Sequence, residues 1–167
     1  MRMQMLIAKV IMMFQNRLNG QGAHVGLPFL CSALFGKIEK RSFMASIFSK
    51  IIAGEIPSYK IYEDEKTYAF LDINPESKGH TLVVPKLEVD KIYELPDEDY
   101  HALWASVKKV AAHMEEVSGR RVVMKVVGTD VPHAHVHLMP MDETWEYGRT
   151  IQLTEDEFNE IQAKLAF

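Results

Sequence analysis

The longest regular pattern of apolar residues lies in the middle of the chain and has the spacing of an amphipathic helix. Pro96 and Asp97 precede it and Gly119 follows it, and these residue types are typical of a helix start and a helix end. The pattern predicts a helix over Glu98–Val117. Its apolar positions recur in steps of four and three: Leu103, Val107, Val110, Met114 and Val117.

Shorter apolar runs, separated by Pro, Asn and Gly, predict five strands on either side of this helix. A short helix over Ile47–Ala53, capped by Ser46, precedes the strands. A capping box formed by Thr154 and Glu157 opens a closing helix. Strands clustered around one long helix indicate an α+β fold with an antiparallel sheet. The strands are expected over residues 60–63, 67–71, 80–84, 121–127 and 135–139.

The composition is that of a globular protein. Of the 167 residues, 47% are hydrophobic and 25% are charged, which allows one ordinary domain and an extension. No apolar run approaches the roughly 18 residues that a membrane-spanning helix needs, so no membrane partner is expected. The single cysteine, Cys31, excludes an internal disulfide framework and is consistent with a reducing, cytoplasmic location. The net charge of −4 argues against nucleic-acid binding, which requires a basic surface.

Charge is distributed unevenly and divides the chain near residue 44. Residues 1–44 carry six basic residues and one acidic residue, a net charge of +5. Residues 45–167 carry 13 basic and 22 acidic residues, a net charge of −9. We therefore predict a basic extension over 1–44, a folded domain over 45–145, and a C-terminal tail and helix over 146–167.

The extension is interpreted as a poorly ordered tail, or as a start assigned too early with Met44 as the first residue. Its basic, acid-poor composition also suits a transit peptide, in which case organelle import is expected. A secretory signal is disfavoured, because no small-residue cleavage site follows an uninterrupted apolar run.

Three histidines at alternating positions are the strongest indication of a functional site in the sequence. His133, His135 and His137 are separated by apolar residues, and successive side chains of a strand point to opposite faces. The three imidazoles therefore share one face, while the residues between them point into a core. Chance is a poor explanation of this row, because histidine is scarce and rarely alternates.

Two kinds of site fit such a row. An H-x-H pair on one strand can bind zinc with a third ligand, for which Asp130 is a nearby candidate. Alternatively, one neutral imidazole nitrogen attacks phosphorus while its neighbours donate hydrogen bonds to the phosphate oxygens. The loop over residues 128–130 favours the second interpretation, because backbone N–H groups of small residues can surround a phosphate.

The sequence around these histidines resembles the histidine triad (HIT) superfamily. His133–Met139 matches its H-φ-H-φ-H-φ-φ signature. Three further segments match, in family order, the blocks of its Hint branch, the nucleoside phosphoramidases: Ser46–Pro57, Ala69–Pro75 and Gly79–Lys86. Four ordered blocks over about residues 46–140 make the resemblance specific.

The resemblance implies an α+β fold with a five-stranded antiparallel sheet, one long helix and one or two short helices, in a homodimer with a ten-stranded sheet. It implies a hydrolase or transferase that attacks the α-phosphate of purine nucleotide conjugates, of the phosphoramidate type, through a covalent nucleotidyl-histidine. Such a mechanism requires no cofactor and no metal. The alternatives are a dinucleoside polyphosphate hydrolase of the Fhit-like type, a nucleotide-binding dimer with little turnover, and a metal-dependent hydrolase.

Four histidines take catalytic roles when the family pattern is carried over. His135 matches the nucleophile, and His137 matches the residue that bonds the phosphate oxygens and assists the leaving group. His133 matches the position that orients the nucleophile, and His80 resembles a fourth histidine beside the triad. Asp72 matches the carboxylate that accepts both ribose hydroxyls. The other implied contacts are the base walls Ile47, Phe48, Ile51, Phe70, Ile73 and Leu82 and the phosphate loop Gly128, Thr129 and Asp130.

The chain departs from the family pattern near the site. Glu88 stands where many members have the histidine of Pro-Lys-x-His, a position outside the triad. Asp130 replaces the usual Ser or Thr, and a carboxylate there would repel phosphate unless it points away. The loop is also shorter, and the family's usual Asn has no clear counterpart near Lys125 or Val126. These differences bear on the leaving group rather than on the triad.

Overall fold

A computed structural model describes residues 45–141, 143, 145–146 and 148–167 of the chain. The predicted extension over 1–44 lies outside the described residues. The proposed division into 1–44, 45–145 and 146–167 stays a prediction, as does the cytoplasmic location.

Five strands form one antiparallel sheet in the order β1-β2-β3-β5-β4. The predicted α+β fold with a five-stranded antiparallel sheet is confirmed. The strands are β1 (Lys60–Glu63), β2 (Thr67–Leu71), β3 (Thr81–Pro85), β4 (Val122–Lys125) and β5 (Val136–Pro140). The helices are α3 (Ile47–Ile52), α4 (Asp97–Ser118), α5 (Glu155–Leu165) and the 3-10 turn η1 (Ile92–Glu94).

β4 is shorter than the pattern predicts, and β5 is shifted by one residue toward the C-terminus. β5 begins at Val136 and not at His135, and the last residue pair between β4 and β5 joins Lys125 to His137. Residues after Lys125 therefore have no strand beside them on this side, and β4 ends there. His133 and His135 precede β5, and only His137 lies within it.

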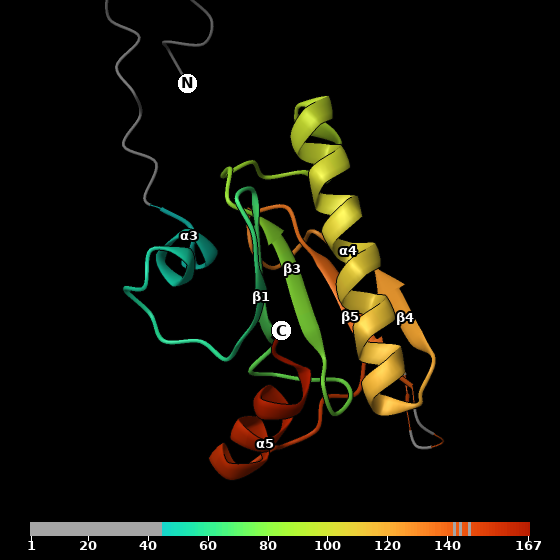
Figure 1. The fold of residues 1–167 in the computed structure, drawn as a ribbon. Coiled ribbons are helices and arrows are strands. Elements are labelled where there is room, and N and C mark those ends of the chain that lie inside the picture. The colour runs from blue at the N-terminus through green and yellow to red at the C-terminus, as the bar shows by residue number, and fades with distance from the viewer. Residues whose placement is uncertain (1–44, 142, 144, 147) are drawn as a thin grey trace, which may run out of the picture. The chain divides into compact units, whose positions relative to one another are not determined.

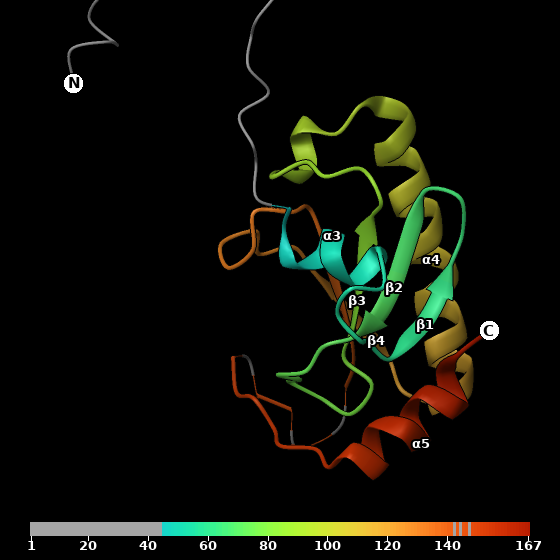
Figure 2. The same ribbon diagram turned by 90° about the vertical axis from the view of Figure 1, so that its left-hand side faces the viewer.

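The sheet separates two apolar layers (Figures 1 and 2). On one face, alternate residues of β2, β3 and β5 pack against the buried stripe of α4, including Leu103, Val107 and Val110. On the other face, Phe70 and Leu82 pack against Phe48 of α3. His137, the second residue of β5, lies between Val136 and Leu138, which are buried against α4. Its side chain therefore projects toward the α3 face.

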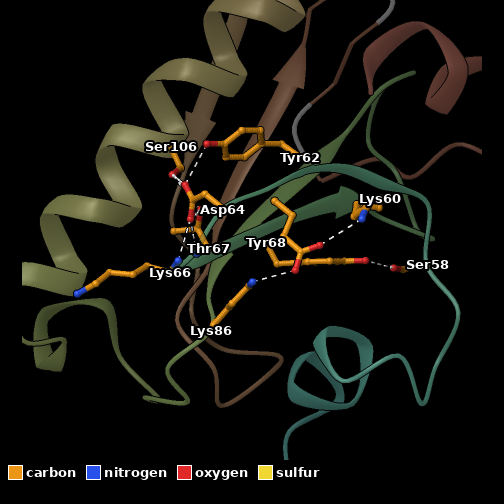
Figure 3. Close-up of polar contacts among 10 residues, drawn as sticks. Ser58, Lys60, Tyr62, Asp64, Lys66, Thr67, Tyr68, Lys86 and Ser106 are labelled. Atoms are coloured by element: carbon orange, nitrogen blue, oxygen red, sulfur yellow. Dashed lines mark hydrogen bonds and ion pairs between the residues drawn. The ribbon is translucent and has the colours of Figure 1, made fainter. Parts of the chain in front are cut away.

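Asp64 fixes the turn between β1 and β2 to α4 (Figure 3). Its carboxylate accepts hydrogen bonds from the Lys66 and Thr67 backbone N–H groups at 2.9 and 2.7 Å. The hydroxyls of Tyr62 and Ser106 also donate to it, at 3.0 and 2.8 Å. Because Ser106 lies on α4, the carboxylate anchors the long helix to the hairpin.

α5 packs at one end of the sheet, beside β1 and α4. The predicted capping box is present, with Thr154 and Glu157 bonding reciprocally at its start. Phe158 stacks on Tyr59 with ring centroids 4.8 Å apart. Within the described part of the chain, no helix combines the length and the apolar character needed to cross a membrane.

Candidate active site

His135 has a defined tautomer. Its Nδ1 lies 2.6 Å from the carbonyl oxygen of His133. A carbonyl oxygen only accepts, so Nδ1 carries the proton and donates. The lone pair of the neutral ring is therefore on Nε2, which is the nitrogen available for attack on an electrophile. The side chain is 4% exposed.

His133 is held from both sides. Its Nε2 lies 2.8 Å from the carbonyl oxygen of Pro85 and must donate to it. Its Nδ1 then accepts a hydrogen bond from the Ser46 hydroxyl, at 2.7 Å. Burial lowers the pKa of His133, so the ring is neutral at neutral pH. A ring fixed in this way also fixes the carbonyl group that orients His135.

His80 and His137 form a second hydrogen-bonded pair. The backbone N–H of Glu76 donates to His80 Nδ1 at 3.1 Å, so the neutral His80 ring carries its proton on Nε2. That Nε2 lies 3.0 Å from His137 Nδ1 and donates to it. His137 therefore carries its own proton on Nε2. This atom is buried and has no hydrogen-bond partner among the described residues, so it is a donor available to a ligand.

Burial lowers the pKa of both members of this pair to about 4. The positive charge of Lys125, which lies beside His137 on β4, is a smaller contribution to the same lowering of both pKa values. Lys125 also forms a largely buried ion pair with Glu76, with Nζ and Oε1 2.5 Å apart. Both rings are thus neutral near pH 7, as their hydrogen bond requires.

Phe48 joins the histidines to α3. Its ring meets His135 and His133 edge to face, with centroids 5.3 and 5.8 Å apart. It also meets Phe70 in the same manner at 5.5 Å. The N-cap of α3, Ser46, bonds His133, so this helix contacts the histidine row by both packing and hydrogen bonding.

A cavity of about 440 Å³ opens beside Phe48. The structure brings to it every residue predicted for the base and ribose, although their contact with a nucleotide stays a prediction. Its lining is mostly apolar, and Asp72 contributes a carboxylate. The lining residues are Ile47, Phe48, Ile51, Ile56, Pro57, Ser58, Tyr59, Phe70, Leu71, Asp72, Ile73, Leu82 and Glu155.

Asp72 connects this cavity to the histidines. Its Oδ1 accepts the backbone N–H of Asn74 at 2.9 Å, and its Oδ2 lies 3.7 Å from His80 Nδ1. One ligand atom from each of Asp72, His80 and His137 lies within 4.8 Å of the other two, a spacing that a metal ion could occupy. This group includes one histidine of the row and lacks Asp130, so it differs from the predicted H-x-H zinc site, and a chelator tests it.

The predicted phosphate loop is only partly brought to the site. Gly128 lines a second cavity, of about 310 Å³, together with His135. Thr129 and Asp130 are exposed, and the Thr129 hydroxyl donates to Asp130 Oδ1 at 3.1 Å. Neither residue lines either of the two cavities described above. The role of this loop in phosphate binding stays a prediction.

Sequence reasoning missed two groups of residues near the site. The first includes Ser58, Tyr59 and Glu155, which line the larger cavity. Ser58 and Tyr59 follow the matched block directly, so their proximity was a usable signal. Glu155 comes from α5, and no local pattern indicates that it reaches this cavity. The second group is the Lys125–Glu76 ion pair, whose members are 49 residues apart in sequence.

Comparison with known proteins agrees with this geometry. The family model described as "HIT domain" matches residues 53–144. A HIT-like protein of Methanocaldococcus jannaschii is 44% identical over 102 residues, 58% of this chain and 79% of that protein. The adenosine 5′-monophosphoramidase of Saccharomyces cerevisiae is 39% identical over 99 residues, 58% of this chain and 62% of that enzyme. The crystal structure of a Hit-like protein from Bartonella henselae superimposes with a TM-score of 0.66 at 29% identity, covering 72% of this chain and 92% of that one.

Proposed function

Because the chain belongs to the HIT family, we propose that it is a nucleotide hydrolase or transferase acting on the α-phosphate of purine nucleotide conjugates. The substrate class is the nucleoside phosphoramidates, in which an amine is bonded to the phosphorus. Relatives named adenosine 5′-monophosphoramidase, 37 to 40% identical to this chain, support this choice.

The proposed reaction has two steps. In the first, the lone pair on His135 Nε2 forms a bond to the α-phosphorus, and the bond from phosphorus to the leaving amine breaks. The amine takes a proton from water, so it leaves as a neutral molecule, while His137 Nε2–H donates a hydrogen bond to a phosphate oxygen. In the second step, a water oxygen attacks phosphorus, and its proton passes to the hydroxide that the first step left. The phosphorus–nitrogen bond to His135 then breaks, and the nucleoside monophosphate is released.

The observation that carries this proposal is the complementary protonation of two neighbouring histidines. Hydrogen bonds leave a lone pair on His135 Nε2 and a proton on His137 Nε2. Their ring centroids are 4.9 Å apart. A nucleophile and a hydrogen-bond donor for the phosphate oxygens, within one substrate's reach, are two groups that displacement at phosphorus needs.

The larger cavity is the proposed nucleoside site. Its apolar side chains suit the faces of a purine, and the Asp72 carboxylate can accept hydrogen bonds from both ribose hydroxyls. Asp72 lies beside His80, so a ribose held there places its 5′-phosphate toward the histidines. No cofactor takes part in the proposed steps.

The proposed assembly is a homodimer joined through β4. This strand lies at an edge of the five-stranded sheet. Met124 within it and Val126 just after it are 49% and 44% exposed, although both are apolar. An edge strand with apolar residues favours pairing with a second copy, which gives a sheet of ten strands.

The test is the release of adenosine monophosphate from adenosine 5′-monophosphoramidate in excess chelator. The parent chain is compared with His135→Ala, and with His101→Ala as a control at an exposed histidine of α4. We expect turnover in the parent and in the control and none in His135→Ala. Loss of turnover in the parent on adding chelator would replace this mechanism with a metal-dependent one. Turnover of dinucleoside polyphosphates alone would assign the Fhit-like alternative, and nucleotide binding without turnover of either would assign a binding protein.

A further inference from the structure

Glu88 lies outside the triad in sequence, but its carboxylate receives two hydrogen bonds from the first turn of α3. The Ser49 hydroxyl donates to Oε2, and the Ser46 backbone N–H donates to the same oxygen at 3.1 Å. These bonds lower the pKa of Glu88, the Ser49 hydroxyl contributing most, so the carboxylate is charged at neutral pH. The carboxylate thus fixes the start of α3 to the loop that follows β3.

The hydrogen bonds that continue from this carboxylate have a single consistent direction. The Ser46 hydroxyl accepts the Ser49 backbone N–H at 3.0 Å and donates its own proton to His133 Nδ1. His133 donates from Nε2 to Pro85 and offers its carbonyl oxygen to His135 Nδ1. Ser46 is 7% exposed and His133 is fully buried, so water does not readily replace these partners.

A competing bond shows what the carboxylate prevents. The Ser49 hydroxyl oxygen lies 3.5 Å from His133 Nδ1, while the Ser46 hydroxyl oxygen lies 2.7 Å from it. Because the Ser49 hydroxyl donates its hydrogen bond to Glu88, only the Ser46 hydroxyl donates to the His133 ring. Without the carboxylate, two hydroxyls compete for one nitrogen, so the Ser46 bond to His133 Nδ1 weakens while the Nε2 bond to Pro85 remains.

We propose that Glu88 is a positioning residue that sets the orientation of the nucleophile His135 through Ser46, Ser49 and His133. This inference rests on the proposed function. The same hydrogen bonds hold α3, whose Phe48 packs on His135 and lines the nucleoside cavity. Glu88 therefore links the position of Phe48 in the cavity wall to the orientation of His135 Nε2.

The experiment compares the parent with Glu88→Ala, Glu88→Gln and the control Glu65→Ala, an exposed glutamate of the β1–β2 turn. We expect Glu88→Ala to lower kcat on adenosine 5′-monophosphoramidate by at least about 10-fold, because small misplacements of reacting groups are costly. We expect KM and the affinity for adenosine monophosphate to change less than kcat, because Phe48 is only one of the residues that line the cavity. Glu88→Gln keeps an acceptor oxygen of the same reach, and it retains more activity than the alanine variant. A kcat in Glu88→Ala equal to that of the control would overturn the inference.

A second measurement separates this inference from the proposed function. Imidazole ¹H–¹⁵N correlation spectra report the tautomer and hydrogen bonding of His133 and His135 without any turnover. In Glu88→Ala we expect the Nδ1 resonance of His133 to move and the Nδ1–H resonance of His135 to broaden, with both unchanged in Glu65→Ala. Unchanged spectra in Glu88→Ala would overturn the inference even in an active enzyme. Altered spectra would support it even if the parent lacked phosphoramidase activity.

A third variant covers the case in which Glu88→Ala does not fold. Ser49→Ala removes the strongest bond to the carboxylate but leaves the N-cap hydroxyl of Ser46 in place. Ser49→Ala also removes the competing hydroxyl, so it reports only the lost anchoring of α3 to Glu88. We therefore expect a smaller fall in kcat and a smaller shift of the His133 resonance than in Glu88→Ala. No change in either quantity would overturn the role of Ser49 in the inference.

Discussion

His80 Nε2 lies 3.0 Å from His137 Nδ1, and the Glu76 backbone N–H fixes which of the two nitrogens donates. Only the doubly neutral pair satisfies this geometry. If His137 gains a proton, two N–H groups face each other. If His80 gains one, its new N–H faces the N–H of Glu76. The hydrogen bond between the two rings, which orients His137 Nε2–H, therefore persists only while both rings remain neutral.

The first prediction concerns the pH dependence of catalysis. The pKa values of His80 and His137 are about 4, so we expect their contribution to kcat to be constant from pH 7 to pH 5 and to fall as the pH passes below about 4.5. The measurement is kcat against pH for the parent, corrected for acid hydrolysis of the substrate without enzyme. A fall in kcat centred on pH 6.5, the ordinary pKa of histidine, that disappears in His80→Gln would contradict the low pKa values of this pair.

The second prediction concerns stability. A histidine whose pKa is lower in the folded state than in the unfolded state binds fewer protons when folded. Stability therefore rises with pH between about 4 and 6.5 and falls as acid is added. For His80 the shift to about 4 corresponds to roughly 3 kcal/mol of unfolding free energy lost between pH 7 and pH 4. Urea unfolding of the parent and of His80→Gln at both pH values measures this loss of unfolding free energy. The loss should be smaller in the variant. Equal losses would exclude His80 as the titrating group.

The third prediction concerns the ribose. Asp72→Asn keeps an oxygen for the Asn74 N–H, so the local turn survives, but it can no longer accept two hydroxyl protons. We expect the preference for a ribonucleoside over a 2′-deoxyribonucleoside phosphoramidate, measured as a ratio of kcat/KM, to fall by about 10-fold. Asp156→Asn, at an exposed carboxylate of α5, is the matched control and should leave the ratio unchanged. A parent without any ribose preference would remove Asp72 from the proposed site.

The fourth prediction concerns Phe48. Its ring contacts His133, His135 and Phe70 and is 7% exposed. Replacement by alanine should lower the unfolding free energy by about 3 kcal/mol and weaken adenosine monophosphate binding as well. Calorimetry of unfolding and of binding measures the two effects. Phe167→Ala, which removes a ring 46% exposed that packs on His113 of α4, should leave binding unchanged. Equal binding by both variants would place the nucleoside elsewhere.

Gly79 gives the fifth prediction. Its φ of +91° disfavours any other residue, and an added Cβ would lie 3.3 Å from Leu165 Cδ1 and from Pro140 Cγ. Gly79→Ala should therefore lower stability by about 1–3 kcal/mol and increase hydrogen exchange in α5. Gly54→Ala has similar backbone strain, with φ of +77°, but open space around its Cβ. The difference between the two variants isolates the packing of α5, and equal losses would show that Leu165 simply moves aside.

Patterns among neighbouring residues were enough to predict the helices and strands. They predicted less of the candidate site. β1 and β2 have the predicted bounds, and α4 differs from its prediction by one residue at each end, because strand alternation and helical spacing are properties of adjacent residues. The stripe of α4 is buried as predicted except at Val117, which is 42% exposed in the last turn.

Contacts between distant segments explain what the sequence could not supply. The Ser46 hydroxyl and His133 are 87 residues apart, and Glu88 and Ser49 are 39 residues apart. Serine at the start of a helix already has a sufficient explanation as an N-cap. Only the folded chain shows that the same hydroxyl also orients a histidine.

The origin of Glu155 in α5 has a consequence for the order in which the domain is built. α5 follows all five strands along the chain, yet Glu155 from its first turn lines the nucleoside cavity and Leu165 from its last turn packs beside Gly79, next to His80. During synthesis the strands and all four histidines leave the ribosome before α5 does. The proposed nucleoside cavity therefore lacks a lining residue until α5 has been made and has packed beside the sheet. A nucleotide that binds there would stabilise the docked position of α5 over an undocked one.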